Sequence, residues 1–255
     1  MTDPQTRTAL VTGASRGIGR AIAVRLAADG FLVIVHYHQA AHAAAGVVAD
    51  IETRGGMAFT VQADFRTLAG ADALLKAADD GLARLGLPPE LDVLVNNAGI
   101  PLPCGIEETT EAAFDEMLAI NLMAPFFLAQ RALPRLRDGG RIINISSGTS
   151  QIALPEEAAY AMAKAALNSF TRSLAKLLGE RGITVNAIGP GITETDFQGE
   201  WLSDPQAREF AASISAFSRL GVPEDVAGVA AFLASDDARF ITGAYIDASG
   251  GSLLG

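Results

Sequence analysis

Short apolar runs alternate along this chain with longer segments whose small and apolar residues recur at helical spacing. The apolar runs predict strands at residues 8–11, 31–35, 58–62, 91–95, 141–145, 184–188 and 245–247. The intervening segments predict helices at residues 20–29, 40–54, 68–84, 111–136, 158–178 and 223–234, the fourth of them disturbed near Pro125. This alternation predicts an α/β fold, a doubly wound parallel sheet of about seven strands with helices on both faces.

The 255 residues contain no linker rich in Pro, Gly or Ser and no internal repeat. One α/β domain can be this long, so we expect residues 1–255 to fold as a single domain. The longest uncharged run, residues 30–49, is interrupted by three histidines, and residues 1–10 lack an apolar signal core. We therefore expect no membrane span and no membrane partner.

The formal net charge of −10 argues against a nucleic-acid partner, because proteins that bind the phosphate backbone are normally basic. Cys104 is the single cysteine, so an intrachain disulfide cannot form. This agrees with a reducing, cytoplasmic location. We also expect no metal, because neither cysteine nor acidic residues lie near His36, His38 and His42 in the sequence to complete a site.

Glycine and polar residues cluster directly after four of the predicted strands, at residues 12–19, 96–99, 146–147 and 189–191. The carboxyl ends of parallel strands share one edge of a sheet, and ligands bind at that edge. Gly13, Gly17 and Gly19 would let a pyrophosphate approach the backbone at a helix N-terminus. Their spacing differs from G-x-G-x-x-G, and a tight turn without a ligand is the alternative interpretation.

Tyr160 and Lys164 lie four residues apart on a predicted helix, so they share one face of it. A free tyrosine has a pKa of about 10, and a neighbouring lysine cation would lower that pKa toward the working range. Ser147, after the preceding strand, adds a hydroxyl that can hold a carbonyl or alcohol oxygen. The three residues predict a proton-transfer site at a carbon–oxygen bond.

Taken together, the motifs Thr12-Gly13-Ala14-Ser15-Arg16-Gly17-Ile18-Gly19, Asn96-Asn97-Ala98-Gly99, Tyr160-Ala161-Met162-Ala163-Lys164 and Pro190-Gly191 resemble the classical short-chain dehydrogenase/reductase family. The resemblance extends over nearly the whole chain and is closest to the 3-oxoacyl-carrier-protein reductases. It implies a Rossmann-like fold, a nicotinamide cofactor and a catalytic tetrad of Asn121, Ser147, Tyr160 and Lys164. Ser147 is favoured over Ser146 because it precedes Tyr160 by the family's usual interval of thirteen residues.

The resemblance also implies the roles of these residues. Tyr160 would donate the proton, Ser147 would hold the substrate oxygen, and Asn121 would anchor a water that relays protons to Lys164. The implied cofactor contacts are Gly13, Ser15, Arg16, Gly17, Ile18, Gly19, Tyr37, His38, Asp64, Asn97, Ala98, Gly99, Tyr160, Lys164, Pro190, Gly191, Ile192 and Thr195.

The end of the second predicted strand indicates which cofactor is used. NAD-preferring relatives have a carboxylate there, whereas this chain has Tyr37 followed by His38. Arg16 in the glycine turn is suited to a phosphate, because its guanidinium is forked and permanently charged. We therefore expect NADP(H), with Arg16 contacting the 2′-phosphate.

The predicted activity is NADP-dependent reduction of a ketone to a secondary alcohol, with a 3-oxoacyl thioester as the favoured substrate and acyl carrier protein as a possible partner. Arg181 matches a basic docking position, but Asp138 lies where such enzymes tend to be basic. The alternatives are another small ketone or alcohol, such as a sugar, steroid or quinone, or a non-catalytic nucleotide sensor. By resemblance, residues 193–220 form a substrate lid whose aromatics favour an apolar substrate, and the protein is a homotetramer.

Overall fold

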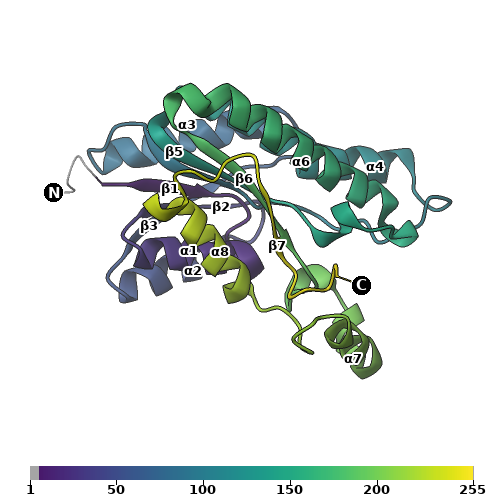
Figure 1. Ribbon diagram of the computed structural model, residues 1–255. Helices are drawn as coiled ribbons and strands as arrows, with labels where there is room; N and C mark the ends of the chain where they lie inside the picture. Colours follow the sequence, from purple (N-terminus) through teal and green to yellow (C-terminus); the bar gives the residue numbers. More distant parts are fainter. Residues whose placement is uncertain (1–5, 255) are drawn as a thin grey trace.

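The computed structural model describes residues 6–254, so the outer limits of the predicted domain, residues 1–5 and 255, lie outside it. Seven parallel strands form one sheet in the order β3-β2-β1-β4-β5-β6-β7 (Figure 1). The strands are β1 Thr8–Val11, β2 Leu32–Tyr37, β3 Met57–Gln62, β4 Leu91–Asn96, β5 Leu136–Ile145, β6 Thr184–Pro190 and β7 Tyr245–Ala248. The predicted fold class is confirmed.

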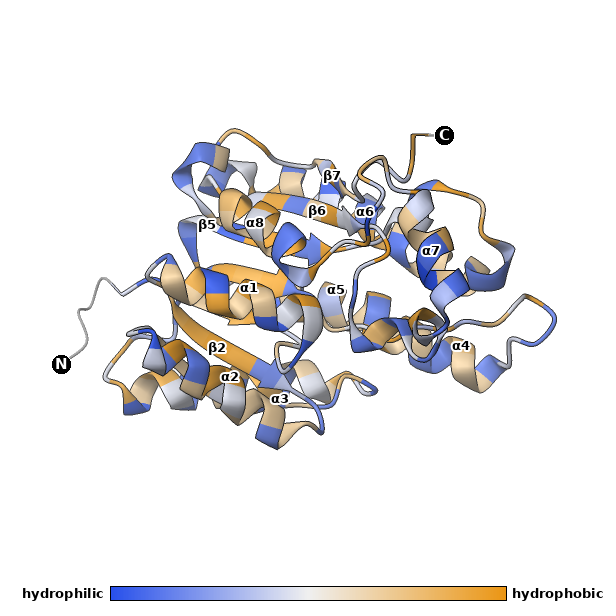
Figure 2. Cartoon of the chain, turned by 90° about the horizontal axis from the view of Figure 1, so that it is seen from below, coloured by the Kyte–Doolittle hydropathy of each residue, from blue (hydrophilic) through white to orange (hydrophobic). Residues whose placement is uncertain are grey.

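Helices cover both faces of this sheet, as the alternating pattern predicted. One face carries α1 (Gly17–Ala28), α2 (Ala41–Thr53) and α8 (Pro223–Ala234), whose apolar side chains pack on the strands with residues such as Val33 and Val95. Figure 2 shows this face, with the apolar strand β2 behind α1 and α2. The other face carries α3 (Ala69–Arg84), α5 (Ala124–Ala132) and α6 (Ala158–Leu178), packed on residues such as Leu10 and Ile34.

The helix predicted at residues 111–136 is divided into α4 (Glu111–Leu118), a π-helical turn η1 (Ala119–Met123) and α5. The side-chain nitrogen Nδ2 of Asn121 donates to the Met117 carbonyl at 3.0 Å. A side chain therefore bonds to a backbone carbonyl one turn before it in the helix. Pro125 offers no N–H to the carbonyl four residues before it. Both features account for the widened turn, which places Asn121 inside the protein.

The predicted C-terminal end of that helix, residue 136, is wrong. Helix α5 ends at Ala132, and Pro134, two residues later, has no N–H with which to continue the helical hydrogen bonds. Leu136 instead begins β5 and pairs with Leu91 of β4. The fifth strand therefore starts five residues earlier than the apolar run at 141–145 indicated. The first half of the strand was not predicted, because Asp138 and the two following glycines interrupt the apolar pattern.

One segment of the described chain, Glu111–Ala132, is long and apolar enough to cross a membrane. It comprises α4, η1 and α5. Leu128, Ala129 and Ala132 belong to the core on the face of the sheet that carries α3, α5 and α6. The apolar composition of the segment therefore has a role within the fold.

Residues 193–220, the predicted lid, leave the sheet after β6 and return before α8. Thr193 pairs with Gly221 in an isolated parallel bridge, so the two ends of the segment are joined. Between them lie the short helices η5 (Asp196–Gln198) and η6 (Trp201–Ser203) and the helix α7 (Pro205–Ser213). Figure 1 shows α7 projecting from the body of the molecule below the carboxyl end of β7.

Candidate active site

The carboxyl ends of β1 and β4 are joined by a network centred on Thr12. Its hydroxyl accepts the backbone N–H groups of Asn97 at 2.9 Å and Ala98 at 3.0 Å and donates to the Val95 carbonyl at 3.2 Å. The Asn97 side chain donates back to the Thr12 carbonyl at 2.8 Å. The predicted residues of the glycine turn and of the segment after β4 therefore lie together. Thr12 itself was not among the predicted site residues.

The glycine turn has a backbone suited to an anion. Gly13 and Gly17 have φ of 63° and 53°, a left-handed conformation that residues with a Cβ rarely adopt. A Cβ on Gly19 would lie 2.4 Å from the Asn97 amide nitrogen, so that glycine is required by packing. Helix α1 begins at Gly17 without a side-chain cap at Arg16 and without an acidic residue in its first turn. Its uncapped N–H groups can bind a phosphate.

Asn121 and Lys164 approach each other on either side of Gly99. A Cβ on Gly99 would lie 2.7 Å from Asn121 Oδ1 and 3.7 Å from Lys164 Nζ. The Asn121 side chain, 1% exposed, exchanges hydrogen bonds with the backbone of Ile100 at 3.2 Å and 3.0 Å. Lys164 Nζ donates to the Ile145 carbonyl at 2.9 Å. Three predicted residues are thus brought together, and Asn121 also fixes the loop after β4.

Ser147 is held in a defined conformation at the end of β5. Its hydroxyl accepts from Thr149 N at 3.2 Å and is 3.0 Å from the Thr149 hydroxyl, whereas its carbonyl accepts the Ser150 hydroxyl at 2.7 Å. The buried Ser146 hydroxyl points instead to the Lys164 carbonyl, at 3.4 Å. This geometry favours Ser147 over Ser146 as the residue facing a substrate. Thr149 was not predicted, because a threonine after a strand carries no distinctive signal.

Tyr160 lies near Lys164 and Ser147, but the net effect on its pKa is opposite to the one predicted. The pKa of Tyr160 is raised, because the phenol is buried and because the Glu157 carboxylate is near; a hydrogen bond with Ser147 opposes this shift. Lys164 Nζ lies 5.6 Å from the centre of the Tyr160 ring. Burial lowers the pKa of Lys164 itself to about 8. The sequence motif did not reveal that the pair is almost fully buried.

The residues predicted to bind the adenosine half of the cofactor form a charged cluster. His38 Nε2 lies 3.5 Å from Asp64 Oδ2, and Asp64 forms an ion pair with Arg66 at 2.7 Å. The pKa of Asp64 is lowered to about 2, mainly by its hydrogen bonds with Arg66. Arg66 was not predicted; its position two residues after Asp64 was the only available signal. Tyr37, at the end of β2, is half-buried beside them.

Arg16 is the residue that the sequence predicts to contact the 2′-phosphate. In the structure it faces the lid segment, with a guanidinium nitrogen 3.6 Å from Asp196 Oδ2. Thr195 lies against Gly17, and its methyl carbon would be 3.3 Å from a Cβ at that glycine. These residues line a cleft of about 220 Å³ between the glycine turn and the start of the lid.

The remaining predicted residues lie at the carboxyl end of β6. Pro190 is the last residue of that strand, and the backbone of Gly191 packs so closely on Ser249 that a Cβ would lie 2.8 Å from its Cα. Thr193 donates to the Gly191 carbonyl at 3.0 Å, which shapes the chain through Ile192.

The three histidines are not grouped as a metal site. His36 is buried and bonded within the fold, and His38 faces Asp64. Residues 6–254 contain no group of three or more His, Cys, Asp or Glu side chains that would hold a metal ion.

Comparisons with known proteins identify the family. A family profile described as enoyl-(acyl carrier protein) reductase matches residues 13–252. The crystal structure of the angucycline C-6 ketoreductase LanV with bound NADP superposes with a TM-score of 0.94 at 49% identity, covering 98% of this chain and 96% of that chain. A second LanV structure, with NADP and rabelomycin, gives a TM-score of 0.90 at 48% identity, covering 98% and 97% of the two chains.

Two fungal proteins are similar over nearly their full length. Versicolorin reductase stcU of Emericella nidulans is 40% identical over 257 residues, 96% of this chain and 95% of its own. The short chain dehydrogenase/reductase nsrJ of Aspergillus novofumigatus is 37% identical over 257 residues, with the same shares of the two chains. These matches confirm the family that the sequence motifs indicated. The chain belongs to the short-chain dehydrogenase/reductase family of oxidoreductases.

Proposed function

We propose that this protein uses NADPH to reduce a ketone on a fused-ring aromatic substrate of the polyketide type. The observation that carries the proposal is the contact between Tyr160, the predicted proton donor, and Phe197 of the lid segment, whose ring centres lie 6.0 Å apart. An aromatic ring beside the proton donor suits a flat aromatic ketone, since such rings attract one another in tilted and offset arrangements.

The described residues fit a nicotinamide dinucleotide. The left-handed glycines and the uncapped start of α1 suit its pyrophosphate, while His38 and Arg66 offer cationic or hydrogen-bonding groups at the adenosine end. The predicted cofactor, NADP(H), agrees with LanV, which was crystallised with NADP. When bound, the reduced nicotinamide supplies the hydride that the side chains cannot provide.

The side chains of the site would handle the proton and the substrate oxygen. Burial keeps Tyr160 in the phenol form, which is the form that donates a proton to a carbonyl oxygen as it gains charge. The Ser147 hydroxyl, oriented by Thr149, would hold that oxygen. Lys164 lies within the same buried site and would favour the phenolate left after transfer. These are the roles that reduction of a ketone requires.

The surface features favour a small diffusible ketone over a substrate carried by acyl carrier protein. Arg181, the predicted docking residue, is engaged within the fold: it pairs with Asp138 at 2.8 Å and donates to the Leu133 carbonyl at 2.9 Å. By contrast, the lid segment exposes large apolar side chains, including Trp201 and Phe217. LanV and versicolorin reductase are named for polycyclic substrates. The 3-oxoacyl thioester stays a prediction.

Oxidation of NADPH in the presence of three ketone classes tests this assignment. Rabelomycin is the polycyclic probe, a 3-oxoacyl thioester represents the predicted alternative, and a keto-sugar represents small polar substrates. We expect the highest kcat/KM with rabelomycin. Higher kcat/KM with the thioester would favour the fatty-acyl alternative. Tight NADPH binding without turnover of any probe would favour the nucleotide sensor.

We also propose that residues 193–220 form the substrate lid of a single domain. The bridge between Thr193 and Gly221 joins the two ends of this segment. Phe197 and the exposed Trp201 lie between those ends. Trp201 is the only tryptophan of the chain, so its fluorescence reports on the lid alone. A change in that fluorescence on adding rabelomycin to the NADP-loaded enzyme is expected; unchanged fluorescence during turnover would argue against a lid.

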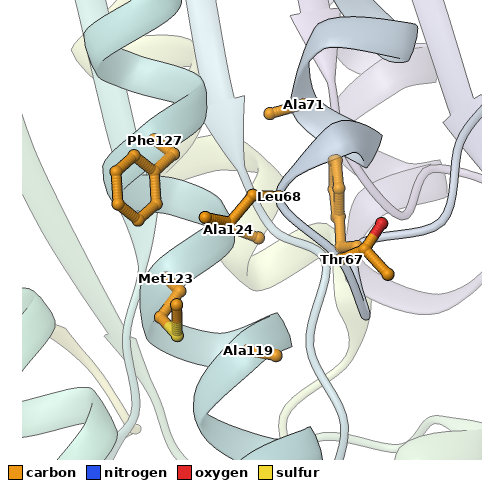
Figure 3. Close-up of a pocket in the computed structure, with 8 residues that line it drawn as sticks. Thr67, Leu68, Ala71, Ala119, Met123, Ala124 and Phe127 are labelled. Carbon is orange, nitrogen blue, oxygen red and sulfur yellow. The ribbon is translucent and has the colours of Figure 1, made fainter.

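The predicted homotetramer stays a proposal, supported by the outer surface of α5 and α6. Large apolar side chains are exposed on both helices, including Phe126 and Met162, and Phe126 packs against Phe170 of α6 with ring centres 4.9 Å apart. Met123 and Phe127 also line a shallow apolar pocket beside Leu68 (Figure 3). Light scattering should give four times the chain mass; a monomer at micromolar concentration would refute the proposal.

A further inference from the structure

His36, on β2, bonds through both nitrogens of its ring. The Gly13 N–H donates to Nδ1 at 3.1 Å, and Nε2 lies 3.3 Å from the Ala63 carbonyl oxygen. The residue is 2% exposed and its ring packs on Phe65, with ring centres 4.6 Å apart. Because an N–H can only donate and a carbonyl can only accept, these partners select the neutral tautomer with its hydrogen on Nε2.

The two partners of His36 lead to opposite ends of the candidate cofactor site. Gly13 opens the glycine turn in front of α1, and Ala14 N–H donates to the His36 carbonyl at 2.8 Å, so this one residue holds two successive amides of the turn. Ala63 directly precedes Asp64, which forms the charged cluster with His38 and Arg66. The imidazole therefore connects the pyrophosphate side with the adenosine side.

We propose that His36 is a positioning residue for NADP(H), fixing the glycine turn and the segment after β3 relative to each other before the cofactor binds. This inference rests on the proposed NADP(H)-dependent function. His36 need not touch the cofactor, because it acts through the backbone of Gly13 and Ala63.

The charge state of His36 suits this role. Burial lowers the pKa of His36 to about 4; the hydrogen bond to Ala63 opposes the shift and the neighbouring His38 adds to it. The ring therefore stays neutral near pH 7, and Nδ1 remains available to accept the Gly13 N–H. The two partners satisfy both ring nitrogens of this buried side chain, and both belong to segments of the candidate cofactor site.

A matched pair of substitutions separates positioning from packing. The amide of asparagine reaches the place of Nδ1, whereas the longer glutamine places its amide near Nε2. His36→Asn should therefore keep an acceptor for Gly13, and His36→Gln should keep only the bond to Ala63. Each variant loses one of the two contacts, so their melting temperatures should fall by similar amounts.

The two variants should differ in cofactor affinity. We expect the Kd for NADPH, measured by calorimetry, to stay within roughly twofold of wild type in His36→Asn and to rise about tenfold in His36→Gln, where the buried Gly13 N–H loses its acceptor. At saturating NADPH, kcat should be unchanged in both variants, because the tyrosine and its neighbours are untouched. Equal Kd values in the two variants would overturn the inference.

Amide hydrogen exchange provides a readout that needs no cofactor. The Gly13 amide should exchange slowly in the wild-type protein and in His36→Asn, and rapidly in His36→Gln. Rapid exchange in the wild type would overturn the inference even if both variants failed to fold. Failure of the wild type to bind NADPH would instead contradict the proposed function. In that case, slow exchange at Gly13 would still support the contact between Gly13 and His36.

Discussion

The Tyr245 hydroxyl donates a hydrogen bond to the Ser147 carbonyl at 3.2 Å, connecting the last strand of the sheet with the candidate substrate-binding serine. This contact depends on a glycine between them. A Cβ on Gly189 of β6 would lie only 1.8 Å from the Tyr245 hydroxyl oxygen, so the tyrosine ring occupies the space that a side chain at residue 189 would need. Gly189 therefore leaves the space in which Tyr245 can reach and support the backbone of Ser147.

Gly189→Ala tests this pair. The added methyl group must displace the Tyr245 ring or the strand, and overpacking of this kind typically costs about 1–3 kcal/mol. We expect a lower melting temperature and a kcat reduced by about tenfold, since Ser147 shifts with its neighbours. The double variant Gly189→Ala, Tyr245→Val removes the clash and should recover most of the melting temperature. No recovery would show that Tyr245 is not what the methyl group displaces.

Tyr245→Phe isolates the hydrogen bond from the ring. The Ser147 carbonyl still accepts the Ser150 hydroxyl at 2.7 Å, so we expect kcat to fall by only about two- to fivefold, in line with one neutral hydrogen bond. Circular dichroism should be unchanged. A loss as large as that of Gly189→Ala would assign the catalytic effect to the hydroxyl rather than to the packing.

The order of strands and helices was predictable because it depends on local patterns of apolar residues. The candidate site was largely predictable because its residues lie directly after strands that share one edge of the sheet. The Gly189–Tyr245 pair was not, since it joins two strands through a three-dimensional fit that leaves no periodic trace. The π turn at Asn121 was likewise visible only as a proline nearby, because a side-chain contact to Met117 creates it.

Cofactor choice gives the next prediction. Arg16→Ala should weaken NADPH binding far more than NADH binding if its guanidinium leaves Asp196, 3.6 Å away, for the 2′-phosphate. Both side chains are largely exposed, so the existing ion pair is worth little and offers weak competition. The two Kd values should be measured side by side, with Arg25→Ala on the outer part of α1 as the control. Equal losses for both cofactors would exclude 2′-phosphate recognition by Arg16.

Arg66→Ala tests the cation that the sequence did not reveal. Arg66 lies 3.3 Å from His38 and pairs with Asp64, so its removal leaves the Asp64 carboxylate without its main partner at the adenosine end. An uncompensated carboxylate should repel a phosphate, and we expect weaker NADPH binding with a smaller change for NADH. Stronger NADPH binding in Arg66→Ala would contradict this placement.

Acid stability should depend on His36. Its pKa is lowered to about 4 in the folded protein, whereas an unperturbed histidine in the unfolded chain titrates near about 6.5. Between these values the unfolded chain binds more protons, so the free energy of unfolding falls as the pH is lowered through this range, by up to roughly 3 kcal/mol. Urea unfolding should show a smaller loss in His36→Asn. Parallel pH profiles for the two proteins would contradict the assignment.

The direction of the Tyr160 pKa shift could not be deduced from the sequence. A lysine four residues away predicted a lowered pKa for Tyr160, because a nearby cation favours the phenolate. Burial cannot be deduced from that spacing, and in the structure it has the larger effect: Tyr160 is 7% exposed and Lys164 3%. Burial therefore keeps Tyr160 in its neutral phenol form near pH 7.

The role of Tyr160 as proton donor is tested most directly by comparing wild-type protein with Tyr160→Phe in the NADPH-dependent reduction of rabelomycin. Phenylalanine keeps the ring, and with it the packing against Phe197, but has no proton to donate. We predict that turnover falls by roughly 10²-fold or more while the Kd for NADPH and the melting temperature change little. Near-wild-type turnover in Tyr160→Phe would show that Tyr160 is not the proton donor.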